Sequence, residues 1–549
     1  MSKIFRELLE RRGITEDFLY PKYEKGCQAK LLPDLAPAIA RIKRAIDSHQ
    51  KVLIYGDYDV DGVTASTAMY DTLKLAGISD IEIMLPNRFS DGYGMSNKII
   101  PRALENKIDL VVTVDCGSRN HEIISKLTEH NIDTIITDHH ECGTDLPVAV
   151  AILNPKRKDQ DVPQELKDLA GVGVVFKLAE GLVEAGLIPE GQEKWLLDLV
   201  LIGTICDSMP MSLENRRLCY YGLKVINKTR RAGLKELFAL TKIRHLGGDT
   251  IGFQIGPRLN AAGRLESAEL ALELLMAKSR PRAAQLALKL DNLNKARREK
   301  QDSALAEIEQ NGIGKSPVIV TQGDWHEGVL GIIAGRLTES YHRPAFALAP
   351  CQKDEKKNIE PDISDSEIIL KGSGRSFGDF NLAKALDHCQ DLLLGGGGHA
   401  EACGVTLQEK KFTSFCERLN DYYRSLKLAD QKHYLDLKAD LEIIDLPKLS
   451  LELITEIKQL EPFSANNTEP IFLLRNMRIV EASRLGDRQQ HLRLLVWDQN
   501  GENMKLMWFY APEKYLKLTS GGTANIWITL NENEFRGTRS IEGRILKIA

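Results

Sequence analysis

The sequence lacks the patterns that mark secreted, zinc-binding and membrane proteins. Its nine cysteines include no CxxC pair, which argues against both a zinc ribbon and a secreted disulfide framework. No apolar run reaches the ~18 residues that a membrane-spanning helix needs. The first residues, MSKIFRELLERRG, form a charged amphipathic pattern and do not resemble a signal peptide. We therefore expect a cytoplasmic protein without a membrane segment.

An excess of positive charge is also missing. Lysine and arginine total 73 against 77 aspartate and glutamate residues, which gives a net charge of −4. A polyanionic ligand would therefore have to meet a local basic patch. Residues 216–244 contain nine lysines and arginines and a single acid, Glu236, so we predict that this stretch follows a phosphate backbone. The alternative is an ordinary solvated helix face.

The chain is too long, at 549 residues, for a single hydrophobic core. Short β-branched runs alternate with helical patterns in its first third, which predicts a parallel sheet with crossover helices. A smaller α/β pattern follows a long helix, and at least five short alternating runs near the end are typical of an OB-fold barrel. We predict an α/β protein with a helical lead-in, a parallel-sheet catalytic domain, a connecting helix, a smaller α/β domain, a helical linker and an OB-fold nucleic-acid-binding domain, at residues 1–50, 51–280, 281–312, 313–410, 411–429 and 430–549.

Three carboxylates spaced by two follow the first buried strand of this pattern. Val52 to Ile54 read as that strand, and Asp57, Asp59 and Asp61 come directly after it. In an extended backbone, alternate side chains share a face, so the three carboxylates would converge. Two of them ~5 Å apart at an effective dielectric near 20 repel by roughly 3 kcal/mol, so the arrangement calls for a cation. An acidic surface loop is the alternative.

Further acids and imidazoles follow three other apolar runs. Asp115 follows LVVTV, the pair His139 and His140 follows TIIT and Asp138, and Asp207 follows LVLIGTIC. We read each run as a strand, so that a parallel sheet would deliver these groups to one edge. Carboxylates with imidazole suit two divalent cations, Mn²⁺ or Mg²⁺, the usual device for in-line attack on a phosphate ester. Adjacent histidines point in different directions, so one can bind metal while the other contacts substrate.

Polar groups flanked by glycine predict phosphate and DNA contacts. In the second α/β segment, polar side chains lie in glycine-rich turns, and an anion can approach the backbone of these glycines closely. In the first, arginines follow a strand end or interrupt an Ala/Gly-rich segment. The candidates are Arg88, Arg258, Asn260, Arg264, His326, Ser373, Arg375, Ser376, Gly397 and His399. For each, a structural role is the alternative.

The motifs GDYDVDG, VDCG and DHH, with the segment around Asp207, resemble the signature motifs of the DHH phosphoesterase family. Together with PNRFSDGYG, GPRLNAAGRL, GDWHEGVLGIIAGRL and GSGRSFGDFNL…GGGGHAEACG, the chain resembles the RecJ family of single-stranded-DNA exonucleases within it. The resemblance implies a DHHA1-type second domain. It also implies that Asp115 bridges two ions, that His140 faces the scissile phosphate, and that the metal ligands are Asp59, Asp61, Asp115, His139 and Asp207.

This sequence departs from the family pattern at one position. Where the first motif of the wider family often has a histidine, this chain has Tyr55, and Asp57 is our candidate for the missing ligand. Whether Asp57 would bind an ion directly or support another ligand stays open.

The resemblance implies a metal-dependent exonuclease that degrades single-stranded DNA from 5′ to 3′ in repair and recombination. It also implies a monomer that works with a single-strand-binding protein and a helicase. Two alternatives differ in class. One is a DHH phosphodiesterase or pyrophosphatase acting on small substrates, and the other is a DNA-binding scaffold without catalytic activity.

Overall fold

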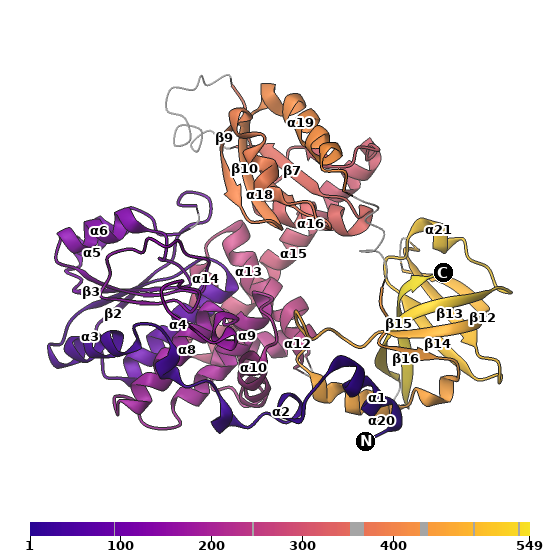
Figure 1. Cartoon of the computed structure of the whole chain (residues 1–549), viewed down its shortest axis with the longest axis horizontal. Helices are drawn as coiled ribbons and strands as arrows, with labels where there is room; N and C mark the ends of the chain where they lie inside the picture. The colour runs from indigo at the N-terminus through magenta and orange to yellow at the C-terminus, as the bar shows by residue number, and fades with distance from the viewer. Residues whose placement is uncertain (93, 244–245, 352–366, 429–436, 487–488, 536–537) are drawn as a thin grey trace.

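Three sheets, joined by helices, make up the computed structural model of the chain (Figure 1). The structure describes residues 1–549 except 93, 244–245, 352–366, 429–436, 487–488 and 536–537. We call the bodies built around the three sheets the first domain, the second domain and the barrel domain. Among the described residues, no helix is both long and apolar enough to cross a membrane.

The first domain contains a five-stranded, fully parallel sheet, which confirms the predicted architecture. Its strand order is β2-β1-β3-β4-β5, with bounds Val52–Tyr55 (β1), Ile81–Met84 (β2), Leu110–Val114 (β3), Asp133–Thr137 (β4) and Ala151–Leu153 (β5). Helices cover both faces of this sheet, so its central strands are buried throughout. The chain runs from β1 outward to β2 and then back to β3 on the other side of β1. That reversal opens a crevice at the carboxyl ends of β1 and β3.

The apolar run before Asp207 is a helix, so our prediction of a fourth strand there was wrong. Helix α9 spans Leu197–Cys206, and Asp207 is its C-cap residue. The run is apolar on every side because α9 is buried between three other helices, α4 (Val60–Leu75), α8 (Gly171–Glu184) and α10 (Leu213–Ile226). A short apolar run without periodicity fits a buried helix as well as a buried strand. Three strand ends and one helix end therefore supply the predicted groups.

The basic stretch 216–244 does not form a continuous surface track. Arg216 and Arg217, both on α10, are buried. Arg216 donates to backbone oxygens of Phe18, Gln459, Leu460 and Glu461, and Arg217 pairs with Glu214. Arg244 lies outside the described residues. The sequence could not separate these buried cations from solvated ones, because the helix also carries polar residues on its buried face.

Helix α15, Arg280–Asn311, connects the first domain to the second, as the sequence predicted. The sheet of the second domain is mixed: β6 and β7 are parallel, and β8, β10 and β9 continue the sheet in antiparallel fashion. Their bounds are Ile319–Gln322, Ala345–Pro350, Ile369–Arg375, Ala402–Gln408 and Leu393–Gly398. Helices α16 (Glu327–Tyr341), α18 (Leu382–Asp387) and α19 (Phe412–Ser425) belong to the same domain.

The barrel domain confirms the predicted OB-fold. Five strands close on themselves in the order β12-β13-β14-β16-β15, because β15 also pairs with β12. Their bounds are Phe472–Leu485, His491–Trp497, Asn503–Trp508, Thr538–Ile548 and Thr523–Phe535, and β11 (Leu441–Ile443) adds a short parallel edge. The predicted start of this domain, at residue 430, falls outside the described residues.

The N-terminal helix packs against the barrel domain, which lies at the other end of the chain sequence (Figure 1). We expected residues 1–50 to lead into the first strand. Helix α3 (Leu35–Asp47) does so, whereas α1 (Lys3–Arg12) buries Phe5 and Leu8 in the core of the barrel domain. Arg12 also binds Asp440 through two nitrogen atoms, at 2.7 Å each. The first residues therefore complete a core whose other members lie more than 400 residues away.

We expect Phe5→Ala to destabilise the barrel domain by about 3–5 kcal/mol, because it removes a fully buried aromatic ring and leaves a cavity. Calorimetry of the full chain should show the transition of the barrel domain at a lower temperature. Lys3→Ala on the exposed face of the same helix is the control. An unchanged thermogram for Phe5→Ala would mean that α1 contributes nothing to that core.

Candidate metal centre

The loop after β1 turns directly into helix α4 and does not continue as an extended strand. Asp59 is the N-cap of α4, and its Oδ1 accepts a hydrogen bond from the Gly62 N–H at 2.9 Å. Asp61 lies in the first helical turn. A Cβ at Gly62 would lie 2.5 Å from the carbonyl oxygen of Asp57, so only glycine lets the helix start pack on this loop. Asp57 and Asp59 belong to one group of donor atoms and Asp61 to an adjoining one. A helix cap, and not strand alternation, brings these carboxylates near one another, so our prediction of alternation was wrong.

Asp61 is held by the start of helix α8. Its two carboxylate oxygens accept hydrogen bonds from the backbone N–H groups of Gly171 at 2.6 Å and Val172 at 3.0 Å. Unpaired N–H groups at a helix N-terminus favour a negative charge. We did not predict this support, although the Gly-Val-Gly sequence at the start of α8 could have indicated it.

Backbone approaches the carboxylates closely on a second side. A Cβ at Gly171 would lie 2.8 Å from Asp115 Oδ1, and one at Gly203 would lie 2.6 Å from Asp61 Oδ1. Asp115 itself has a φ of 60°, in the left-handed region that aspartate tolerates better than most residues. Strained backbone of this kind is concentrated at functional sites.

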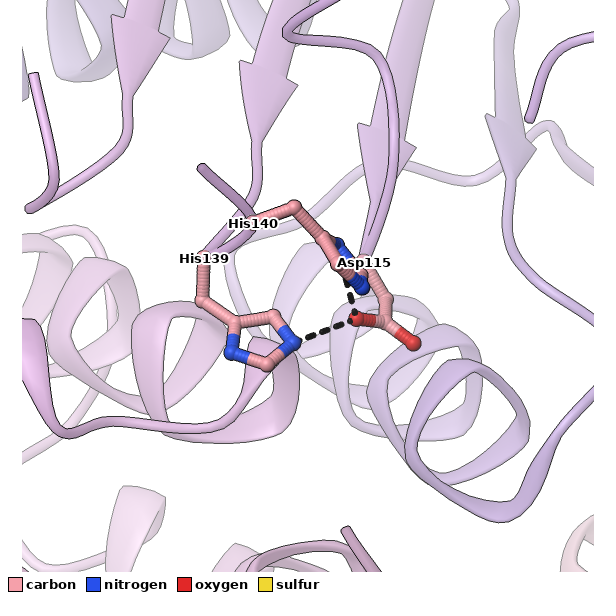
Figure 2. A group of neighbouring side chains, drawn as sticks. All are labelled: Asp115, His139 and His140. Atoms are coloured by element: carbon pink, nitrogen blue, oxygen red, sulfur yellow. Dashed lines mark ion pairs between the residues drawn. The ribbon is translucent and has the colours of Figure 1, made fainter. Parts of the chain in front are cut away.

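His139 lies at the centre of the group. Its Nε2 atom is 3.0 Å from Asp115 Oδ1, 3.6 Å from Asp207 Oδ2 and 3.7 Å from Asp61 Oδ2. Figure 2 shows His139 and His140 approaching the same oxygen of Asp115 from two sides, with His140 Nδ1 at 3.8 Å. We expected the two rings to point in different directions, but both reach the same oxygen. His139 is buried and His140 is about one-third exposed, so the two neighbours still differ in access to a ligand.

Asp138 fixes the orientation of His140, a role that the sequence analysis did not assign. Its Oδ1 atom lies 2.9 Å from His140 Nδ1 and accepts from the backbone N–H groups of both histidines, while Oδ2 accepts from the Ser118 N–H at 3.0 Å. Burial alone would raise the pKa of Asp138, but the bond from His140 and the two imidazoles hold it well below its usual range. Burial and the neighbouring His140 lower the pKa of His139 to about 3, so its ring is neutral and able to bind metal.

Four of the carboxyls have pKa values far above the usual range. Burial, and then the charge of Asp59, raise the pKa of Asp57 to about 8 and that of Asp61 to about 7. Burial, and then Asp61, raise that of Asp207 to about 8, and burial with the neighbouring carboxylates raises that of Asp115 well above its usual range. In the protein alone, these groups cannot all be ionised together. A positive charge among them would restore their ionised forms.

The donor atoms form two adjoining groups that fit hard divalent cations. Atoms of Asp57, Asp59 and Asp115 lie within 4.8 Å of one another, and so do atoms of Asp61, His139 and Asp207. Asp115 lies beside both groups, through its contact with His139. Its buried Oδ1 atom accepts no hydrogen bond from any described residue, which is typical of an oxygen that binds a cation.

Thiolates take no part in this site. Cys116 and Cys206 lie beside it, but burial and the surrounding carboxylates raise the pKa of both thiols, which stay protonated. Oxygen and imidazole donors without thiolate suit Mn²⁺ and Mg²⁺.

Arginines from both domains gather at this edge of the first domain. Burial, and then the charges of Arg88, Arg297 and Arg375, lower the pKa of Arg264 to about 9. Arg88 lies over the ring of Tyr58, in the loop between the carboxylates, at 5.2 Å. The structure thus brings together three of the predicted cations, and it adds Arg297 from α15, which no sequence pattern indicated. We call Arg88, Arg264, Arg297 and Arg375 the arginine cluster.

Side chains from the second domain support this cluster. Arg375 donates to Ser373 Oγ at 3.0 Å, and Gly331 of α16 packs against both, since a Cβ there would lie 3.0 Å from Arg375 Nη2. His326 caps α16 by accepting from the Gly328 N–H at 3.1 Å, and its ring contacts Phe89 of the first domain. Helix α16 thus begins at the contact between the two domains.

Other predicted residues lie apart from the cluster or make structural contacts. Arg258 pairs with Asp291 of α15 at 2.9 Å, and Ser376 Oγ donates to the Phe380 carbonyl. Asn260 is half-buried on α13 (Gly256–Leu265). Gly397 and His399 are exposed at the end of β9.

Neighbouring aromatic residues of the barrel domain divide between its core and its surface. Trp508 belongs to the core, whereas Phe509 is 50% and Tyr510 73% exposed. The ring of His491 packs edge-on against both exposed rings, at 5.5 and 4.9 Å. These three rings form a small exposed aromatic surface.

Models of known protein families match all three domains of the chain. The DHH family, N-terminal domain, matches residues 51–204, the DHHA1 domain matches residues 315–425, and the RecJ OB domain matches residues 440–547. Each match therefore covers one of the three sheets.

Similar proteins share this arrangement. The single-stranded-DNA-specific exonuclease RecJ of Bacillus subtilis is 36% identical over 98% of this chain and 67% of its own length, and that of Dickeya dadantii is 32% identical over 99% and 95%. The crystal structure of Thermus thermophilus RecJ in complex with Mn²⁺ superposes with a TM-score of 0.81, at 28% identity over 99% of this chain and 75% of that one. A second structure, of exonuclease RecJ bound to manganese, has a TM-score of 0.63 at 31% identity, over 74% and 98% of the two chains. The chain belongs to the RecJ family of DHH phosphoesterases.

Proposed function

We propose that this protein is a metal-dependent exonuclease that hydrolyses the phosphodiester bonds of single-stranded DNA from 5′ to 3′, in DNA repair and recombination. The observation that carries the proposal is the pairing of two adjoining donor groups, one of which contains Asp115 and the other of which contacts it through His139, with a nearby arginine cluster. The donor groups can hold divalent cations, and the arginine cluster can hold phosphates. The family relationship supplies the polarity and the choice of DNA.

Two divalent cations, Mn²⁺ or Mg²⁺, fit the two donor groups. Asp57, Asp59 and Asp115 would hold one, while Asp61, His139 and Asp207 would hold the other. When bound, they supply an activated water nucleophile and Lewis-acid stabilisation of the charge on the phosphate. Four of the six donors, Asp57, Asp61, Asp115 and His139, are buried, which limits screening of that charge by bulk water.

The protein side chains orient the phosphate. Asp138 holds His140 beside Asp115 at a partly exposed position, where the imidazole can donate to the scissile phosphate. Arg88 and Arg375 approach from opposite domains and can bind the next phosphate of the strand by charge-assisted hydrogen bonds. Because these groups come from two domains, the strand would have to lie between them.

The remaining expectations extend this proposal. The protein acts in the cytoplasm as a monomer, together with a single-strand-binding protein and a helicase. The start of α16 contacts α13 directly, so the first and second domains lie close together on that side. The space left between the domains would favour one strand over the wider duplex.

A nuclease assay tests the proposal directly. With Mn²⁺ we expect degradation of long single strands, and much slower turnover of duplex DNA, dinucleotides and pyrophosphate. Faster turnover of the small substrates would favour a small-substrate phosphodiesterase. Binding of single strands without hydrolysis would favour a scaffold.

Asp115→Asn should abolish hydrolysis and most of the stabilisation by Mn²⁺ while preserving the fold. Asparagine tolerates the left-handed backbone of this position, where alanine would add strain. Mn²⁺ at 100 times its dissociation constant should stabilise the wild type by about 2.7 kcal/mol, measured as a shift of the melting temperature. Without metal, Asp115→Asn should melt no lower than the wild type, because one buried carboxyl is gone.

Asp80→Asn is the matched control, because this exposed carboxylate precedes β2 at the opposite end of the sheet. It should leave activity and the Mn²⁺ shift unchanged. Normal turnover by folded Asp115→Asn protein in Mn²⁺ would remove Asp115 from the metal centre.

Arg375→Ala should weaken recognition of a 5′-phosphate. A terminal phosphate carries more charge than an internal one, so loss of a charged hydrogen bond should cost about 1.5–3 kcal/mol more on 5′-phosphorylated than on 5′-hydroxyl DNA. The measurement is kcat/KM for both substrates, with Arg336→Ala, an exposed arginine on α16, as the control. Equal losses on the two substrates would assign Arg375 to an internal phosphate.

Phe509→Ala combined with Tyr510→Ala should weaken binding to long single strands. Stacking of bases on exposed rings contributes about 1–3 kcal/mol per base. Hydrolysis of very short oligonucleotides should be unaffected, because they do not reach the barrel domain. Tyr341→Ala, an exposed aromatic in the second domain, is the control. Unchanged affinity in the double variant would show that these rings serve another purpose.

A further inference from the structure

A cavity of about 630 Å³ lies on the first domain, away from the metal centre. Its volume is within the range of sites for small molecules. Helices α4 and α9 both reach it, and both also carry groups of the metal centre at their other ends. Asp61 begins α4, and Asp71 lines the cavity ten residues further along, a rise of about 15 Å. Likewise, α9 carries Asp198 at the cavity and ends at Asp207.

The cavity presents a net positive charge. Its two carboxylates are already engaged: Arg231 binds Asp71 at 2.8 Å and Asp198 at 3.3 Å, and Thr229 donates to Asp198 at 2.6 Å. Three further cations line the cavity, and none of them has an ion-pair partner among the described residues. They are Lys74, Arg230 and Lys278, all exposed. A ligand of this cavity should therefore be an anion.

The same cavity offers flat surfaces for a ring. The guanidinium carbon of Arg230 lies over the Trp195 ring, 3.7 Å from the ring centroid, in a cation–π contact. Tyr70 lines the cavity as a second aromatic, and Leu275 and Met276 add apolar surface. Arginine and aromatic side chains are the groups on which nucleobases stack. A nucleoside phosphate combines the negative charge and the planar ring that this lining favours.

We propose that this cavity binds a nucleoside phosphate, whose base stacks on Arg230 and Trp195 and whose phosphate is held by Lys74 and Lys278. Arg231 connects α4 and α9 beneath the ligand, so occupancy of the cavity changes the affinity of the metal centre for its cations. Binding of the nucleotide in the cavity does not depend on the proposed function. The coupling between the cavity and the cations rests on the metal centre of that proposed function.

Calorimetry of the metal-free full chain with deoxyadenosine monophosphate tests the binding, and quenching of Trp195 fluorescence reports the site. Arg230→Ala and Lys278→Ala should each weaken binding at least tenfold, whereas Lys43→Ala, an exposed lysine on α3, should not. Trp195→Phe should remove the quenching signal. Arg375→Ala controls for binding at the arginine cluster and should leave the quenching unchanged.

Three outcomes would overturn the binding. Affinity equal in the wild type and in both cavity variants would place the nucleotide elsewhere. Inorganic phosphate that binds as tightly as the nucleotide would remove the role of the base. Cavity variants that weaken binding of long single strands but not of the nucleotide would make this face a DNA contact.

The coupling is measured as the affinity for Mn²⁺ with and without the nucleotide, which needs no turnover. We expect a change of at least fivefold in the wild type and in Arg375→Ala, and its loss in Lys278→Ala. A nucleotide that binds in the cavity without changing Mn²⁺ affinity would overturn the coupling. If the chain proved to lack nuclease activity, both measurements would still stand, so the two proposals fail separately.

Discussion

Repulsion between carboxylates buried at one edge of the first sheet is the constraint on which the rest of the site depends. Burial, together with the charges of neighbouring carboxylates, raises the pKa of Asp57, Asp61, Asp115 and Asp207, which means that the fold holds these groups in an unfavourable arrangement at this edge. The surrounding structure maintains it through rigid backbone: a helix N-terminus holds Asp61, and glycines let α8 and α9 approach the carboxylates. Cations bound between these groups would convert the repulsion into binding energy. Strain at a functional site, supported from elsewhere, is a common arrangement.

The second domain and the barrel domain are joined to the first domain in different ways. The arginine cluster lies next to the carboxylates and includes residues of both α/β domains and of α15. The barrel domain is held to the first domain by the buried guanidinium of Arg216, which binds four backbone oxygens, and by α1 in its core. Helix α1 and the barrel come from opposite ends of the chain, so their packing links the C-terminal domain back to the segment that leads into the first domain (Figure 1).

Much of this could be predicted from the sequence because the informative residues follow apolar runs. Asp115 and the histidines come directly after buried strands, and the carboxyl ends of parallel strands meet at one edge. Asp207 does lie beside His139, but at the end of a helix and not of the strand that we predicted. A run that is buried on all sides has no periodicity that separates helix from strand. The roles of Asp138, Gly171 and Arg297 come from contacts between distant segments, which local patterns do not encode. The packing of α1 on the barrel is another such contact.

The central claim is that two cations share Asp115, and an anomalous-scattering experiment on crystals soaked with Mn²⁺ tests it most directly. The account predicts two peaks, one among Asp57, Asp59 and Asp115 and the other among Asp61, His139 and Asp207, with an Asp115 oxygen in contact with both. A single peak, or two peaks of which neither contacts Asp115, would contradict it.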